Sequence, residues 1–113
     1  MGNTSRRKGH DYERQIRKEF MELGYEECQT SRYASKLTDD KGIDLVGTDP
    51  WAVQCKCYAK SPNYKKVLAD MQTESTQMKL LFHKVPKVND EYVIMEKKDF
   101  MEILQALRVN EIF

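Results

Sequence analysis

Apolar residues in the first part of the chain recur at the spacing of a helix. Four of the large ones are separated from one another by three or four positions, which places them on one face of an α-helix. These residues are Tyr12, Ile16, Phe20 and Leu23. Asp11 suits the N-terminal end of such a helix, and Gly24 suits its stop. The pattern therefore predicts an amphipathic helix over residues 11–23, with Glu13 at the edge of its apolar stripe.

Shorter apolar runs in the middle of the chain have the length of β-strands and are separated by turn-forming residues. The predicted elements are strands at 25–33, 43–47 and 51–58, a polar loop at 34–41 and a turn at 48–50. The connection between the second and third strands is short enough for a hairpin. Such a hairpin brings Asp44 close to Gln54 and Lys56.

The two faces of the third strand, 51–58, can be told apart most clearly from its alternating side chains. Trp51, Val53, Cys55 and Cys57 fall on one face, and Ala52, Gln54, Lys56 and Tyr58 fall on the other. Because successive side chains of a strand point to opposite faces, Gln54 and Lys56 point the same way. We expect Cys55 and Cys57 to be buried thiols on the core face.

The second half of the chain continues with helical and extended segments. The periodicity predicts a helix over 64–78, strands at 80–85 and 91–95, and a last helix that begins at Asp99. Asp99 and Glu102 have the spacing of a capping box. The residues expected to face inward from this helix are Phe100, Ile103, Leu104 and Leu107. The order of elements predicts an α/β fold with a central mixed sheet flanked by helices.

Composition narrows the class of protein. The 113 residues suffice for one domain with one modest core, and 40% hydrophobic with 33% charged residues indicates a globular chain. No apolar run approaches the ~20 residues that a membrane span needs. Residues 1–8 are polar and basic, unlike a secretory signal. The three cysteines, an odd number, favour free thiols in a reducing compartment. We therefore expect a cytoplasmic protein without a membrane partner.

Charge is distributed unevenly along the chain. The formal net charge is +1, but residues 1–66 carry +3 and residues 67–113 carry −2. We expect residues 1–9 to form a flexible basic arm before a single domain at 10–113. The excess of positive charge in the first half permits a surface that faces DNA.

Two carboxylates, an amide and a lysine suit metal-dependent cleavage of a phosphodiester. The reaction needs an activated water, compensation of charge on phosphorus and a stabilised leaving oxygen, and Mg²⁺ serves all three. The candidate ligands are Glu13, Asp44, Gln54 through its amide oxygen and Cys55 through its backbone carbonyl. Lys56 is suited to hold the attacking water or to offset phosphate charge. On spacing alone, a surface hairpin with an ordinary contact between Lys56 and Asp44 explains these residues equally well.

The same residues, taken in order, resemble the PD-(D/E)XK nuclease superfamily. The matching segments are 12–14, 24–25, 31–32, Gly-Ile-Asp at 42–44 and Gln-Cys-Lys at 54–56. They span about half of the chain and look most like archaeal-type and phage Holliday junction resolvases. The Gln-x-Lys variant also resembles the Mrr branch of restriction endonucleases, in which Gln replaces the second acid.

The resemblance implies a restriction-endonuclease-like core and a set of roles. It makes Glu13 and Asp44 metal ligands and Lys56 the catalytic lysine. Gln54 stands where the family usually has Glu or Asp, so the metal should bind more weakly or depend more on Glu13. The implied cofactor is Mg²⁺, with Mn²⁺ as a substitute.

Basic and polar residues near these motifs are candidates for contacts with the DNA backbone. They are Arg6, Arg7, Lys8, Arg14, Arg32, Ser35, Lys36 and Lys60. Resolvases of this type use a serine or lysine on the loop before the Asp strand, and Ser35 and Lys41 are the nearest such residues here. Contacts of this kind carry no sequence information.

The main hypothesis is a metal-dependent DNA endonuclease, specifically a Holliday junction resolvase that cuts four-way junctions. Two symmetric cuts imply a two-fold homodimer, by resemblance to the family. The expected setting is the cytoplasm of a prokaryotic or phage-infected cell. Two alternatives stay open: a Mrr-like restriction or repair endonuclease acting on duplex DNA, and a DNA-binding module of the same fold without catalysis.

Overall fold

The computed structural model describes residues 2–34 and 36–112, which are built around one five-stranded sheet. The strands lie side by side in chain order. They are β1 (Gln29–Thr30), β2 (Leu45–Val46), β3 (Trp51–Cys57), β4 (Met78–Val85) and β5 (Asp90–Ile94). β3 and β4 are parallel, and the other neighbouring pairs are antiparallel. The predicted mixed sheet and the β2–β3 hairpin are confirmed, with Leu45 opposite Val53.

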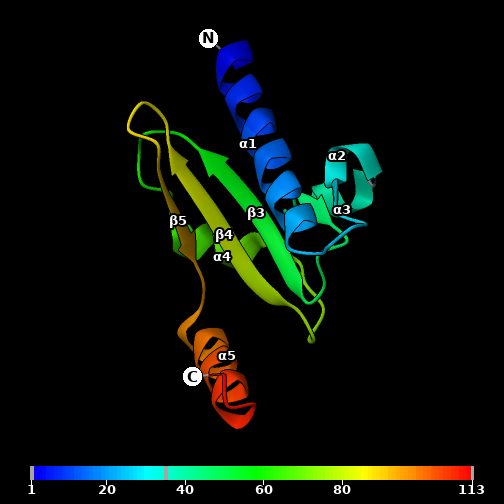
Figure 1. Ribbon diagram of the computed structural model, residues 1–113. Helices are drawn as coiled ribbons and strands as arrows, with labels where there is room; N and C mark the ends of the chain where they lie inside the picture. The colour runs from blue at the N-terminus through cyan, green and yellow to red at the C-terminus, as the bar shows by residue number, and fades with distance from the viewer. Residues whose placement is uncertain (1, 35, 113) are drawn as a thin grey trace.

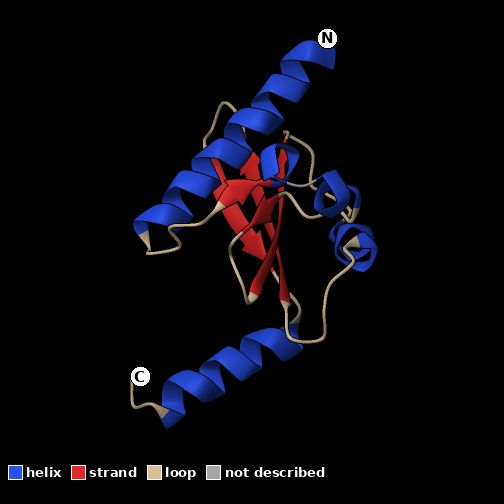
Figure 2. Cartoon of the chain, turned by 90° about the vertical axis from the view of Figure 1, so that its right-hand side faces the viewer, coloured by secondary structure: helices blue, strands red, loops and turns tan. Residues whose placement is uncertain are grey.

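Helices flank this sheet, as predicted. They are α1 (Gly2–Glu22), α2 (Ser31–Ala34), α3 (Lys36–Asp40), α4 (Tyr64–Asp70) and α5 (Lys97–Val109). α1 lies in front of one face of the sheet and α4 behind the other (Figure 1). α5 lies beyond one end of the sheet, at the opposite end of the molecule from the start of α1 (Figure 2). None of the described helices is long and apolar enough to cross a bilayer.

β3 separates two cores because its side chains alternate. The first core contains Tyr12, Ile16, Phe20, Cys28, Leu45, Val53 and Cys55, and the second contains Ile43, Ala52, Leu68, Met71 and Leu81. Ala52 and Val53 are both fully buried, on opposite faces of the same strand. The predicted alternation is therefore confirmed, and the sheet has apolar packing on both sides.

α1 begins earlier than its apolar stripe suggests. The helix starts at Gly2 rather than at Asp11, so residues 2–9, which we expected to form an arm, are helical. Arg and Lys are good helix formers, which allows the helix to extend past its packed part. Gly24 follows the helix with a φ of +109° and ends it as predicted. Leu23 lies beyond the helix and is 76% exposed, so it does not belong to the buried stripe.

The segment before the hairpin is less extended than the predicted strand at 25–33. β1 is only two residues long and pairs with the equally short β2, with Gln29 opposite Val46 and Thr30 opposite Leu45. From Ser31 the chain turns into α2, and the backbone N–H of Ser31 donates to the carbonyl of Asp44. Residues 36–40 form the short helix α3 rather than a loop. These turns bring the segment before β2 close to the hairpin.

α4 is shorter than predicted and ends at Asp70 instead of Met78. Met71 is buried in an extended conformation. The next backbone N–H, that of Gln72, donates to the carbonyl of Lys41 at 3.0 Å. These tertiary contacts override the helical periodicity, and Met78 instead begins β4.

The last helix differs from the prediction at its start and in its surroundings. α5 begins at Lys97 with Glu96 as the N-cap residue, so the predicted capping box at Asp99 is wrong. Asp99 is buried and pairs with the ammonium of Lys98 at 3.0 Å. The exposed apolar residues of this helix include Phe100, Met101 and Leu104. The prediction of inward packing is therefore wrong for Phe100 and Leu104, because α5 projects beyond the sheet (Figure 2). Ile103 and Leu107 are half-buried.

Candidate active site

Two hydrogen bonds hold Asp44 beside β3, and a third ties it to the start of α2. Its backbone N–H donates to the Val53 carbonyl, and its carbonyl accepts from the Ser31 N–H, both at 2.7 Å. Its Oδ2 accepts from the backbone N–H of Cys55 at 2.7 Å. Gly42 precedes it with a φ of +76°, a conformation that residues with a side chain rarely adopt. The local turn and the strand pairing thus place the carboxylate of Asp44 against the middle of the motif on β3.

Burial makes the negative charge of Asp44 costly. The residue is 8% exposed. Burial raises the pKa of its carboxyl to about 7, and the charge of Glu13 adds to this effect. The hydrogen bond from Cys55 and the charge of Lys56 oppose the shift without cancelling it. A buried acid of this kind is in surroundings that a bound cation would stabilise.

Glu13 approaches the same place from α1. It is 9% exposed, and burial raises the pKa of its carboxyl. The guanidinium of Arg32 opposes this shift, since its Nε donates to Glu13 Oε1 at 3.3 Å. The fold thus brings the carboxylates of Glu13 and Asp44 within electrostatic reach of each other from two different elements.

Gln54 connects Lys56 to the turn before Asp44. One orientation of the Gln54 amide gives both its nitrogen and its oxygen a hydrogen-bond partner. In this orientation the nitrogen donates to the Gly42 carbonyl. Its oxygen then accepts from Lys56 Nζ at 3.3 Å. The charge of Lys56 also lowers the pKa of Asp44. The ammonium is therefore held by an amide and lies within electrostatic reach of the buried acid.

A hollow of about 540 Å³ opens beside these residues, which we call the carboxylate hollow. Its wall includes Glu13, Cys55 and Lys56. Basic side chains on the same wall are Arg6 and Lys8 from α1 and Lys87 from the β4–β5 turn. Asp44 does not line this hollow but is hydrogen-bonded to Cys55, which does. A concave site in which basic side chains lie beside a carboxylate is suited to a phosphodiester backbone and a metal ion.

The available donors fit Mg²⁺ bound through few protein ligands. Within residues 2–34 and 36–112, no group of three or more His, Cys, Asp or Glu residues is arranged to hold a metal ion together. Mg²⁺ needs fewer, because it keeps several waters and usually takes one or two carboxylates. Glu13 and Asp44 supply two. The N–H and C=O of a strand residue face the same neighbouring strand, so the Cys55 carbonyl lies on the side of Asp44.

Asp39 is a further acid near the site that sequence analysis did not select. Its charge raises the pKa of both Glu13 and Asp44. It lies on α3, in a polar stretch that we predicted as a loop. The only signal in the sequence is the acidic pair formed with Asp40, and many solvated loops carry such a pair.

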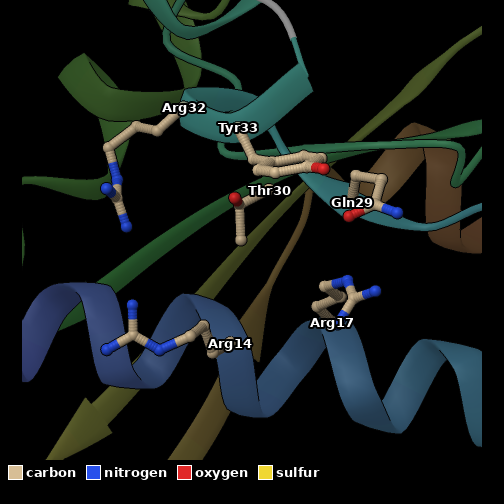
Figure 3. Close-up of a pocket in the computed structure, with 6 residues that line it drawn as sticks. All are labelled: Arg14, Arg17, Gln29, Thr30, Arg32 and Tyr33. Atoms are coloured by element: carbon tan, nitrogen blue, oxygen red, sulfur yellow. The ribbon is translucent and has the colours of Figure 1, made fainter.

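Four of the basic residues predicted to contact DNA line two separate hollows. Arg6 and Lys8 line the carboxylate hollow together with Glu13. Arg14 and Arg32 line a second one between α1 and α2 (Figure 3). Both hollows adjoin Glu13, since Arg14 is its neighbour in α1 and Arg32 is its ion-pair partner.

The other predicted contacts are more scattered. Arg7 is exposed on α1, and Lys60 is exposed beyond the end of β3. Lys36 begins α3, and Lys41 directly follows that helix. Ser35 lies outside the described residues. The role of each of these residues stays a prediction.

Comparison with known proteins identifies a family. The sequence model of the Mrr_cat_2 family, described as restriction endonuclease, matches residues 12–101. No curated protein and no solved structure gives a match. The matched range contains both carboxylates and the Gln-x-Lys motif. The family match supports the alternative of a Mrr-like endonuclease better than the resolvase hypothesis. The chain belongs to the Mrr_cat_2 family of restriction endonucleases, within the PD-(D/E)XK superfamily.

Proposed function

We propose that this protein is a metal-dependent endonuclease that hydrolyses phosphodiesters of duplex DNA. The observation that carries the proposal is that Glu13 and Lys56 line one basic hollow, while Asp44 is hydrogen-bonded at 2.7 Å to Cys55 of the same wall. The family match supports the endonuclease class. Restriction endonucleases act on duplex DNA, so duplex DNA is the substrate that we assign.

Each residue of the site has a role that follows from its position. Glu13 and Asp44 hold Mg²⁺, for which Mn²⁺ can substitute, together with the backbone carbonyl of Cys55. When bound, the metal lowers the pKa of a water and offsets charge on phosphorus. The ammonium of Lys56 orients the attacking water and balances the charge on the scissile phosphate.

Gln54 takes part through Lys56. Because its amide oxygen accepts from Lys56 Nζ, we propose that it sets the position of the ammonium. Direct ligation of the metal by the Gln54 oxygen stays a prediction. Either role is compatible with the absence of negative charge at this position, which leaves Glu13 and Asp44 as the charged ligands.

The two acids argue against a module that binds DNA without cutting it. In a protein that only bound DNA, buried carboxylates would weaken phosphate binding, because like charges repel. They would also destabilise the fold, because burial of a negative charge is costly. A metal ion reverses both effects. Two sites allow both strands to be cut together, and we propose that a two-fold homodimer supplies them.

The proposal is tested with purified protein, Mg²⁺ and two DNAs of matched sequence, a linear duplex and a four-way junction. We expect Mg²⁺-dependent cleavage of the duplex and none in EDTA. Paired symmetric nicks in the junction alone would restore the resolvase hypothesis. If the protein binds both DNAs but cuts neither with Mg²⁺ or with Mn²⁺, the alternative of a DNA-binding module without catalysis would be supported instead.

A further inference from the structure

A second hollow, of about 620 Å³, lies between α1 and α2, and we call it the arginine hollow. Its lining residues are Arg14, Arg17, Gln29, Thr30, Arg32 and Tyr33. Arg14 and Arg17 come from α1 on one side, and Arg32 and Tyr33 come from α2 on the other (Figure 3). Thr30 lies between the two sides (Figure 3).

The arginine hollow is suited to an anion. Three of its six lining residues are arginines, and none of the six is acidic. Arg17 is held by a hydrogen bond of 2.9 Å from its Nε to the Cys28 carbonyl. Arg14 pairs with Asp11, but both side chains are more than half exposed, and exposed ion pairs contribute little to stability. A phosphate can therefore replace Asp11 at low cost.

Arg32 connects the arginine hollow to the carboxylates. Its guanidinium points across the hollow toward α1 (Figure 3), where its Nε donates to Glu13. A guanidinium has five N–H donors, so it can hold a carboxylate and a phosphate at the same time. A phosphate bound by Arg32 would therefore lie beside Glu13.

Tyr33 gives this site a feature that a simple phosphate site does not need. Its side chain is 82% exposed at the edge of the hollow, although aromatic rings gain from burial. An aromatic ring stacks on the face of a nucleic-acid base. In a duplex those faces are covered by neighbouring base pairs, so only an unpaired base offers one. Gln29, beside Tyr33, carries an amide that both donates and accepts hydrogen bonds (Figure 3).

We propose that the arginine hollow binds one unpaired nucleotide of the DNA strand that passes Glu13. Its phosphate contacts Arg14 and Arg32, and its base stacks on Tyr33. The inference rests on the proposed nuclease function and narrows its substrate: the enzyme prefers duplex DNA with unpaired nucleotides beside the cut.

The base contact is tested by fluorescence anisotropy in EDTA. Two labelled duplexes of about two helical turns are compared, one fully paired and one with a central bulge of unpaired thymidines. We expect tighter binding to the bulged DNA, and a loss of about tenfold in that preference for Tyr33→Ala. Tyr33→Phe keeps the ring and should keep the preference. Tyr64→Ala removes another exposed tyrosine, on α4, and is the matched control.

The phosphate contact is tested by the salt dependence of the same binding. Arg14→Gln should lower the slope of log K against log salt by about one, the effect of one lost phosphate contact. Lys18→Gln removes the same charge from an exposed position of the same helix and should leave the slope unchanged. Equal effects of the two substitutions would mean that net charge, and not this site, is responsible, and would overturn the phosphate assignment.

Failure of this inference can be told apart from failure of the nuclease function. If the wild type cuts DNA with Mg²⁺ but Tyr33→Ala binds bulged and paired DNA as the wild type does, the nucleotide site is overturned and the nuclease stands. If the wild type cuts neither DNA but shows a bulge preference that depends on Tyr33, the nucleotide site stands and the nuclease function is overturned. Absence of a bulge preference in the wild type also overturns the nucleotide site.

Discussion

The backbone N–H of Cys55 donates a hydrogen bond of 2.7 Å to Oδ2 of Asp44. This bond ties the acid of the Gly-Ile-Asp motif directly to the strand that carries Gln54 and Lys56. It engages one of the two carboxylate oxygens, Oδ2. Because one neutral donor does not offset the burial of a carboxylate, the pKa of Asp44 stays raised, to about 7.

Asp44→Asn should abolish cleavage and leave DNA binding intact. The amide oxygen of asparagine can still accept from the Cys55 N–H, so the hairpin is preserved. The lost ligand charge should reduce the cleavage rate by about a thousandfold or more, since a metal contributes several kcal/mol to this type of transition state. Binding should be equal or tighter, because a negative charge near the phosphate is removed. Parallel loss of cleavage and binding, measured on one labelled duplex, would contradict a ligand role.

Lys56→Ala should reduce turnover far more than affinity. A positioned ammonium that acts on the transition state is worth on the order of 10²- to 10⁴-fold in rate. We expect kcat to fall in that range and the dissociation constant for DNA to change only a few-fold. Lys65→Ala, at an exposed position of α4, is the control for loss of one charge. A rise in the dissociation constant with unchanged kcat would make Lys56 a binding residue only.

The stability of the metal-free protein should fall as the pH rises from about 4 to about 7. The carboxyl of Asp44 has its pKa raised from 3.8 to about 7 in the fold, mainly by burial. In this window the folded protein retains a proton that the unfolded chain has lost, so the free energy of unfolding decreases with pH. The shift corresponds to on the order of 4 kcal/mol.

Urea denaturation of the wild type and of Asp44→Asn at several pH values in EDTA measures this effect. Asp44→Asn should remove most of the pH slope, because asparagine does not titrate. Addition of Mg²⁺ at about pH 8 should stabilise the wild type and leave the variant nearly unchanged. Identical slopes for the two proteins would show that the burial of Asp44 is not the cause.

Gln54→Glu should have two opposite effects. A carboxylate cannot donate to the Gly42 carbonyl, so this acceptor loses its partner, which should cost about 1–3 kcal/mol of stability. The added negative charge should lower the concentration of Mg²⁺ needed for half-maximal cleavage. Chemical denaturation and a Mg²⁺ titration of activity measure the two separately. A higher Mg²⁺ requirement would place the Gln54 side chain away from the metal.

Local periodicity predicted the elements that carry the site. The stripe of Tyr12, Ile16 and Phe20 is buried on α1, and the alternation through Ala52 and Val53 divides two cores. These patterns are reliable because each reflects a geometry set within a few residues: the helical turn of 3.6 or the strand repeat of two. The order of motifs also predicted the superfamily, and the family match favoured the Mrr-like alternative.

Tertiary contacts decided the features that no local pattern encodes. α4 stops at Asp70 because the following residues are held by the core and by Lys41. The pairing of Arg32 with Glu13 and the influence of Asp39 on both acids likewise depend on short helices in a polar segment. The sequence alone determined which elements carry the acids and the lysine. The tertiary structure decided which charges meet there, because burial and electrostatic reach arise only when distant segments pack together.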